Sequence, residues 1–184
     1  MKFWPVFALL LLPLAPLSAH AETLVPVCGL GRVSAALDSG LVSKNATPRR
    51  FDVHDMEIEN GEKFFFRSEV QDDGGLELDI ATRDPVTKQT SHWLWAEELF
   101  DEMMHHFKET KTPIKYIAGN WYDGTNLKLL NELTRGGTPI EQAALNTWTG
   151  RQARRFGYNK VKVVTKKGAP GRWQMVVVEF YQGD

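Results

Sequence analysis

Hydrophobic and polar residues alternate along three stretches of the chain, as they do in β-strands that are buried on one face. Residues 76–80 alternate strictly, and residues 51–58 and 63–70 alternate enough to predict two further strands. Asn60-Gly61 predicts the hairpin turn between the first two strands. We therefore expect three antiparallel strands at the start of the regular structure.

A helical pattern replaces this alternation in the next part of the chain. Hydrophobic side chains recur there at intervals of three and four residues: Ala96, Leu99, Met103 and Phe107. This spacing predicts a helix over residues 93–108. A short strand is expected over residues 114–121, followed by a short helix that begins at Thr125 and ends at Gly136-Gly137.

A second helix is predicted after the glycine pair, because residues 138–141 have the pattern of a helix start. Thr138 is the expected N-cap, Pro139 the first helical residue and Glu141 the acid of a capping box. Gly157 is expected to end this helix in a left-handed conformation. Residues 160–165 and 173–181 then predict a closing hairpin.

This order of elements predicts an α+β fold, with a mixed, mainly antiparallel sheet of about six strands and two to three helices. It resembles the core of GNAT-type acyltransferases, so a GNAT-like topology is expected. In that family a glycine-containing loop before the first of these helices holds the pyrophosphate of coenzyme A. The corresponding residues 88–93 contain no glycine, and we expect no cofactor.

The first 21 residues have the features of a cleavable secretory signal peptide. A single positive charge at Lys2 precedes an apolar run over residues 3–17, and small residues flank the exit at Ala19 and Ala21. Prolines interrupt the run, which is shorter than the roughly 20 apolar residues of a transmembrane helix. We therefore expect a periplasmic or secreted protein.

The rest of the chain is expected to form one domain. Residues 22–50 show little periodicity and are interpreted as a segment that leads into a single α+β domain over residues 51–184. Cys28 is the only cysteine, so no intramolecular disulfide can form.

Charge is distributed unevenly along the chain, although the formal net charge is −1. Residues 52–109 contain 16 acidic residues and 5 lysines or arginines, whereas residues 135–184 contain 9 lysines or arginines and 3 acidic residues. Three explanations stay open: the two halves of the chain hold each other in register, a basic face meets an acidic partner, or the charges belong to solvated faces of a globular domain.

Several short motifs are similar to domains at the C-terminal tips of large secreted bacterial proteins of the Rhs and filamentous-haemagglutinin types. These motifs lie at residues 101–107, 117–121, 124–127 and 147–150, and the final hairpin follows them. Because such carriers deliver polymorphic toxins, the resemblance implies a toxin-like or effector-like domain. The motifs identify no reaction, so it stays open whether the protein is an enzyme.

Polar and aromatic residues gather where the strand over residues 114–121 passes into the next helix, and again near the end of the second helix. The binding candidates are Trp121, Asp123, Thr125, Asn126, Thr147 and Trp148. Helix starts favour anions and polar ligands because their backbone N–H groups lack partners. The alternative is structural, with the tryptophans in the core and Asp123 or Thr125 as a helix cap.

The helix over residues 93–108 also contains carboxylates four residues before histidines, a spacing that can pair them for proton transfer or metal binding. Asp101 precedes His105, and Glu102 precedes His106. The catalytic candidates are Glu102, His106 and Asp123. A metal would need a further ligand, for which His54 and His92 qualify by residue type alone, and no metal site is assigned.

Basic residues near the C-terminus offer a possible nucleic-acid surface. Arg151, Arg154 and Arg155 lie on one helix, and Tyr158 and Trp173 could stack on bases. A solvated helix end explains the same charges, and nucleic acid is the less favoured partner. A protein partner or another target-cell component is expected instead.

The leading hypothesis is an exported bacterial toxin-like or effector-like domain that acts on or binds a target outside its own cytoplasm. The alternative is a periplasmic binding or immunity-type protein that neutralises another protein. A neighbouring secretion-system or immunity gene would favour the first hypothesis, and a neighbouring effector gene would favour the second.

We predict that the exported chain is cleaved after Ala21, because small residues flank that bond directly after the apolar run. Intact-mass analysis of the protein recovered from the periplasm or medium should give a chain that begins at Glu22. A mass that retains residues 1–21 would contradict the prediction.

Overall fold

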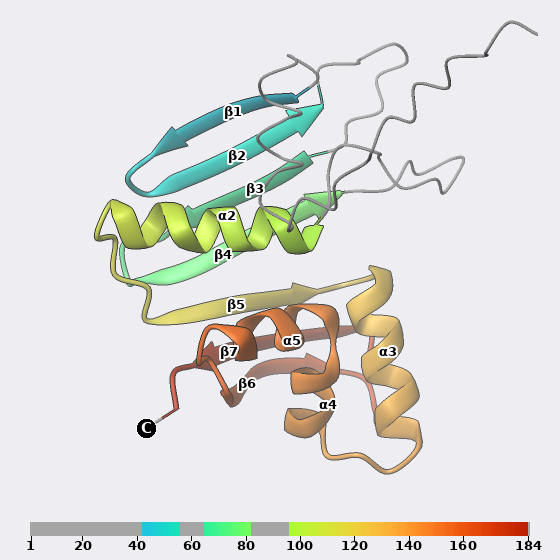
Figure 1. Cartoon of the computed structure of the whole chain (residues 1–184). Helices are drawn as coiled ribbons and strands as arrows, with labels where there is room; N and C mark the ends of the chain where they lie inside the picture. Colours follow the sequence, from blue (N-terminus) through green and yellow to red (C-terminus); the bar gives the residue numbers. More distant parts are fainter. Residues whose placement is uncertain (1–41, 56–64, 82–95, 184) are drawn as a thin grey trace, which may run out of the picture.

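A mixed seven-stranded sheet organises the described part of the chain (Figure 1). The computed structural model describes residues 42–55, 65–81 and 96–183. The strand order is β1-β2-β3-β4-β5-β7-β6, in which β4 and β5 are parallel and all other neighbours are antiparallel. The expected α+β class is confirmed. The described residues form seven strands, slightly more than the six expected, and four helices, where two to three were expected.

Four strands come first in the described part of the chain, and helices and further strands follow. The strands are β1 (Val42–Thr47), β2 (Arg50–Asp55), β3 (Phe65–Val70), β4 (Gly75–Ala81), β5 (Tyr116–Trp121), β6 (Lys160–Lys167) and β7 (Met175–Tyr181). Within the described residues, the helices are α2 (Ala96–Glu109), α3 (Gly124–Arg135), α4 (Ile140–Asn146) and α5 (Trp148–Arg155). Several predicted features lie outside the described residues: the signal peptide, Cys28, the Asn60-Gly61 turn, residues 88–93 and His92.

Strand β1 lies within the segment that showed little periodicity in the sequence. Its register with β2 places Lys44 opposite Val53 and Ala46 opposite Phe51, on the face that carries the core. The Lys44 Nζ lies 5.0 Å from the centre of the Phe51 ring and 3.8 Å from a Glu102 carboxylate oxygen. Because Lys44 occupies a position on the same face as the core, the alternation of hydrophobic and polar residues is interrupted, and the sequence does not predict this strand.

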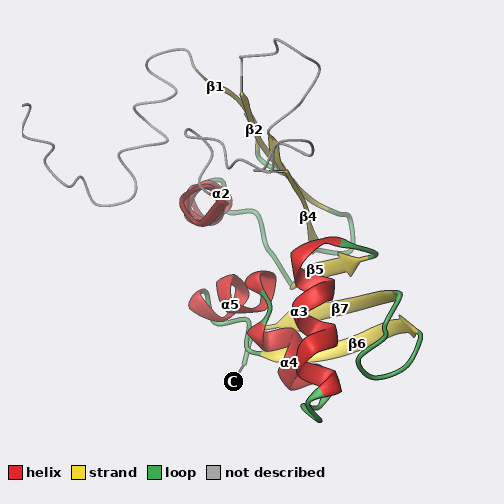
Figure 2. Ribbon diagram, turned by 90° about the vertical axis from the view of Figure 1, so that its right-hand side faces the viewer, coloured by secondary structure: helices red, strands yellow, loops and turns green. Residues whose placement is uncertain are grey.

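The described helices all lie on one face of the sheet (Figure 2). Helix α2 covers β2 and β3 with Leu99, Phe100, Met103 and Phe107, and each of these side chains is at most 1% exposed. Helices α3, α4 and α5 cover the half of the sheet that contains β5, β7 and β6. Full burial of such side chains contributes roughly 1.5 to 3 kcal/mol each to folding.

Aromatic side chains join the two groups of helices. The Phe100 ring of α2 lies 5.9 Å from the Trp148 ring of α5 in an edge-to-face arrangement, and 5.7 Å from Phe156. Edge-to-face pairs are favourable because the positive ring edge meets the negative ring face. These contacts connect α2 to α5 across the junction between β4 and β5.

The predicted start of the second helix is wrong in its capping residue. Helix α4 begins at Ile140, its N-cap residue is Pro139, and no side chain caps it. The Thr138 N–H donates instead to Leu133 O of the preceding helix, and Gly137 adopts a φ of +89°. This segment therefore completes the end of α3 before α4 begins.

The predicted single helix is two helices, because the chain bends at Thr147. Thr147 has an extended backbone (ψ 169°), and its hydroxyl accepts a hydrogen bond from Gly150 N and donates one to Ala144 O. A Cβ on Gly150 would come within 2.1 Å of Ala144 O, so glycine permits this close turn. Gly157 follows α5 with a φ of +86°, as predicted.

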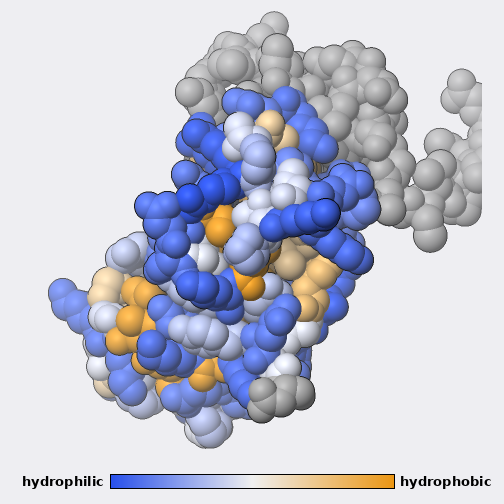
Figure 3. All heavy atoms as spheres, turned by 90° about the vertical axis from the view of Figure 1, so that its left-hand side faces the viewer, coloured by the Kyte–Doolittle hydropathy of each residue, from blue (hydrophilic) through white to orange (hydrophobic). Residues whose placement is uncertain are grey.

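The surface of the described residues is mainly polar. Tyr122 and Val164 are the large hydrophobic side chains exposed there, and hydrophilic residues predominate in the view of Figure 3. Within the described ranges, no helix has both the length and the apolar composition needed to cross a bilayer.

We predict that Thr147→Ala lowers the free energy of unfolding by about 1 to 2 kcal/mol, because it removes the cap of α5. Thr138→Ala is the matched control, and its effect should stay within about 0.5 kcal/mol because its hydroxyl caps no helix. Chemical denaturation should show a lower midpoint for Thr147→Ala alone. If Thr138→Ala lowered the free energy of unfolding more than Thr147→Ala does, Thr138 rather than Thr147 would be the capping residue.

Candidate functional site

Charged side chains form two rows across the sheet face opposite the described helices. The registers of β2, β3 and β4 align Asp52 with Arg67 and Arg67 with Asp79 in the first row. The second row is Arg50, Glu69 and Glu77. Neighbouring strands share a face at aligned positions, so the side chains of each row point to the same side.

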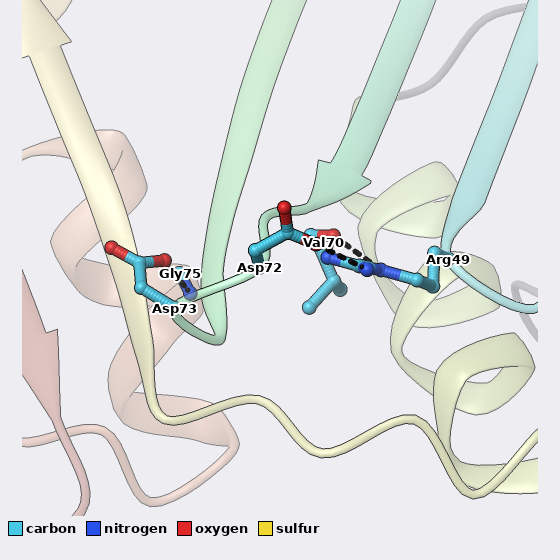
Figure 4. A network of polar contacts seen from close by, with 5 residues as sticks. All are labelled: Arg49, Val70, Asp72, Asp73 and Gly75. Atoms are coloured by element: carbon cyan, nitrogen blue, oxygen red, sulfur yellow. Dashed lines mark hydrogen bonds and ion pairs between the residues drawn. The ribbon is translucent and has the colours of Figure 1, made fainter.

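The turn between β3 and β4 holds these rows in register (Figure 4). The Arg49 guanidinium donates to Val70 O from Nε (2.9 Å) and from a terminal nitrogen (2.6 Å), and another nitrogen lies 2.7 Å from Asp72 Oδ1. Gly75 N donates to Asp73 Oδ1 at 2.9 Å. Because a shift of one residue would turn the charged rows into the core, these bonds help to preserve the site.

The two rows surround a hollow of about 210 Å³, which we call the acidic hollow. Its lining residues are Arg50, Asp52, Arg67, Ser68, Glu69, Gln71, Glu77, Leu78, Asp79 and Asn120. Four carboxylates and two guanidinium groups give this set a formal charge of −2. The local electrostatic environment therefore favours a cationic ligand over an anionic one.

Strand β5 contributes to the hollow because it diverges from β4. The two strands pair only from Gly75 with Tyr116 and from Leu76 with Ile117, and the gap between the ribbons widens beyond this point (Figure 1). The exposed Asn120 lies further along β5 and lines the hollow. Its amide offers both a donor and an acceptor beside the carboxylates.

Asp52 is a buried group in the lining of the acidic hollow, and its hydrogen bonding is incomplete. The residue is only 4% exposed, and its Oδ2 accepts from Arg50 Nε at 2.6 Å. Its Oδ1 is buried and has no hydrogen-bond partner. A buried acceptor without a donor costs about 1 to 3 kcal/mol. A donor from a ligand would recover this energy once a side-chain movement exposes the oxygen to the hollow.

Arg67 does not neutralise Asp52, although the register aligns the two residues. Among the described contacts, its guanidinium carbon lies 4.6 Å from the centre of the Phe65 ring, and no ion pair joins it to Asp52 or Asp79. A cation over an aromatic face is stabilised by the ring quadrupole. Asp79 therefore has no ion pair among the described contacts, whereas Asp52 is paired with Arg50.

Two tyrosines lie on the same sheet face, at the other end of β5 and β7. Tyr116 donates to Asp73 Oδ2 at 2.7 Å, which raises the pKa of Tyr116 well above its usual value and lowers the pKa of Asp73. The hydrogen bond to Glu179 raises the pKa of Tyr181 to about 12. Both phenols therefore stay protonated at neutral pH.

The six binding candidates from the sequence lie outside the acidic hollow. Asn126 connects the two predicted segments, since its Oδ1 accepts from Trp148 N (3.0 Å) and its Nδ2 donates to Thr149 Oγ1 (2.8 Å). Trp121 and Thr147 are buried, whereas Asp123 and Thr125 are exposed. Asp123 occupies the N-cap position of α3 without a side-chain cap bond.

The carboxylate and histidine pairs expected on α2 are replaced by other contacts. His106 Nε2 lies 2.6 Å from Thr47 O, and Glu102 lies 3.8 Å from Lys44. Asp101 forms an ion pair with Arg155 at 2.7 Å. His105 lies 3.0 Å from Glu109. The described residues contain no group of three potential metal ligands.

The basic helix end was considered above as a possible but less favoured nucleic-acid surface. Arg151 donates to Asn146 O, and Arg155 pairs with Asp101 across the helices, while Arg154 is exposed. Tyr158 is 3% exposed and Trp173 is 8% exposed. Neither ring presents a free face of the kind that stacks on bases.

Comparisons with protein-family models, with curated proteins and with solved structures find no match to this chain. Sequence reasoning missed the acidic hollow, although one signal was available: the polar positions of residues 76–80 are both acidic. The burial of Asp52 has no such local signal.

We predict that Asn126→Ala lowers the free energy of unfolding by about 1 to 3 kcal/mol, because it leaves Trp148 N and Thr149 without their partner. Asp123→Ala is the control, since this exposed side chain caps nothing, and it should change stability by less than about 0.5 kcal/mol. Thermal unfolding of the two variants would test the difference. Equal melting temperatures would show that the Asn126 bonds contribute little.

Proposed function

We propose that this chain is an exported domain that binds a cationic group of a target outside its own cytoplasm, through the acidic hollow. The observation that carries the proposal is the buried Asp52 Oδ1 without a donor. An ammonium or guanidinium group has several N–H donors and a positive charge. It could therefore donate the hydrogen bond that this oxygen does not receive within the protein.

The size and charge of the hollow support a side chain as the bound group. A volume of about 210 Å³ accommodates a guanidinium or ammonium head with its adjoining methylene groups. Glu69, Glu77 and Asp79 surround the head with further acceptors, and Asn120 adds a neutral one. A lysine or arginine of a protein target is the simplest ligand that fits this arrangement.

Charge also disfavours the competing ligand classes at this position. A phosphate or carboxylate would meet four carboxylates against two guanidinium groups. One of those guanidinium groups, on Arg50, already pairs with Asp52. The proposal therefore concerns a protein or peptide target rather than nucleic acid, whose phosphates require a basic surface.

Both hypotheses from the sequence are compatible with such a site. A toxin-like or effector-like domain would use it to hold a target component, and a periplasmic immunity-type protein would use it to hold and neutralise another protein. The signal-peptide prediction and the resemblance to secreted toxin tips support the first as the leading proposal. Binding through Asp52 is common to both and is tested directly.

We predict that a disordered peptide of alternating arginine and glycine binds the purified chain, and that Asp52→Asn weakens this binding at least about tenfold. Asp52→Asn preserves the side-chain shape while it removes the charge. Asp123→Asn is the matched control, because it removes one exposed carboxylate outside the hollow. Isothermal titration would measure each affinity.

A second variant covers the case in which Asp52→Asn unfolds the protein. Asp79→Asn changes an exposed carboxylate that lines the hollow, and it should weaken peptide binding without a loss of melting temperature. A peptide with glutamine in place of arginine should not bind. Equal binding of the two peptides, or unchanged affinity in both hollow variants, would refute the proposal.

A further inference from the structure

A second hollow lies at the opposite, basic end of the described structure. It has a volume of about 440 Å³ and is formed by the end of α3, the connection to α4, strand β6 and the loop before β7. We call it the tryptophan hollow. Its lining residues are Thr134, Gly137, Thr138, Pro139, Ile140, Lys166, Pro170 and Trp173.

Trp173 combines a fixed position with an unused hydrogen-bond donor. Its backbone is held on both sides by Asn131, which donates to Trp173 O at 2.9 Å and accepts from Trp173 N at 2.6 Å. The residue is 8% exposed, and its indole Nε1 is buried without an acceptor. Buried tryptophan N–H groups usually have an acceptor, so this one is an exception.

The wall beside Trp173 is also held in place by hydrogen bonds. Gly171 N donates to Thr134 Oγ1 at 2.9 Å, and Arg135 donates to Gly171 O at 3.0 Å. These bonds connect the loop before β7 to the end of α3. The hollow is therefore supported by two elements that are far apart in the sequence, and little reorganisation is needed to keep it open.

Lys166 is the one formally charged residue among those that line the tryptophan hollow. Its Nζ lies 5.5 Å from the centre of the Trp173 ring, so the cation and the unused indole donor lie beside the same aromatic system. The positive charge of Lys166 and the N–H donor of Trp173 both favour an anionic ligand with acceptor oxygens. Ile140 and the two prolines form an apolar part of the lining.

We propose that the tryptophan hollow binds a small organic carboxylate that has an apolar body. On binding, the Trp173 side chain turns its buried indole N–H toward the hollow and donates to one carboxylate oxygen. The other oxygen pairs with the Lys166 ammonium, and the apolar body contacts Ile140 and the prolines. This arrangement follows the general design of small-molecule sites, with a few polar groups in an apolar lining. The inference is independent of the acidic hollow, which has the opposite charge.

The test uses benzoate and the purified ¹⁵N-labelled chain, because each tryptophan indole gives its own ¹H–¹⁵N cross-peak. Trp173→Phe identifies the Trp173 signal by its loss. Titration with millimolar benzoate should move this signal downfield as the N–H gains an acceptor, while the signals of Trp121 and Trp148 stay in place. Benzyl alcohol, which has the same ring and no charge, should bind at least tenfold more weakly.

Lys166→Gln should weaken benzoate binding at least fivefold. The matched control is Lys162→Gln, on the same strand, because Lys162 pairs with Glu179 outside the hollow. Both exposed variants should keep the parent melting temperature, so the comparison does not depend on Trp173→Phe. An unmoved indole signal, equal binding of benzyl alcohol, or unchanged affinity in Lys166→Gln would each overturn the proposal.

Discussion

The period-two alternation of β2, β3 and β4 is the constraint on which the rest of the described structure depends. It places Phe51, Phe66 and Leu76 under the helices and the charged rows on the opposite face. Register and burial are therefore one property, since a slip of one residue would exchange the core for the charges. The bonds of Arg49 to the β3–β4 turn stabilise the register at one end.

The short parallel pairing of β4 with β5 explains why a hollow can form in a sheet at all. If β4 and β5 were paired along their whole length, they would lie about 4.8 Å apart throughout. Their side chains would then leave no room for a hollow between them. Here only two residue pairs are in register, and Asn120 lies beyond them. The contacts of Phe100 with Trp148 and Phe156 connect the helices where the strands separate.

The fold class could be predicted from the sequence because it depends on hydrophobic patterns within single strands and helices. Strict alternation in residues 76–80 and helical spacing before Phe107 both report burial by one neighbouring layer. Strand β1 was missed because Lys44 occupies an inner position, and the bend at Thr147 was missed because its hydroxyl acts on residues that only the folded chain brings together. Asp52 lacks an ion pair with Arg67 because the Arg67 guanidinium lies over the Phe65 ring. No local sequence pattern predicts this side-chain orientation.

Acidic and basic residues are unevenly distributed along this nearly neutral chain, and the two hollows have opposite formal charge. We therefore propose opposite ligand preferences for them. A formal net charge of −1 gives little long-range attraction for any partner, so steering by the whole molecule is weak. Recognition must then come from groups that are desolvated and incompletely bonded, where electrostatic interactions are strongest. Asp52 and Trp173 are such groups, one a buried acceptor and the other a buried donor. Under the two proposals, selectivity between cationic and anionic ligands follows from the local charge of each hollow rather than from the overall charge of the chain.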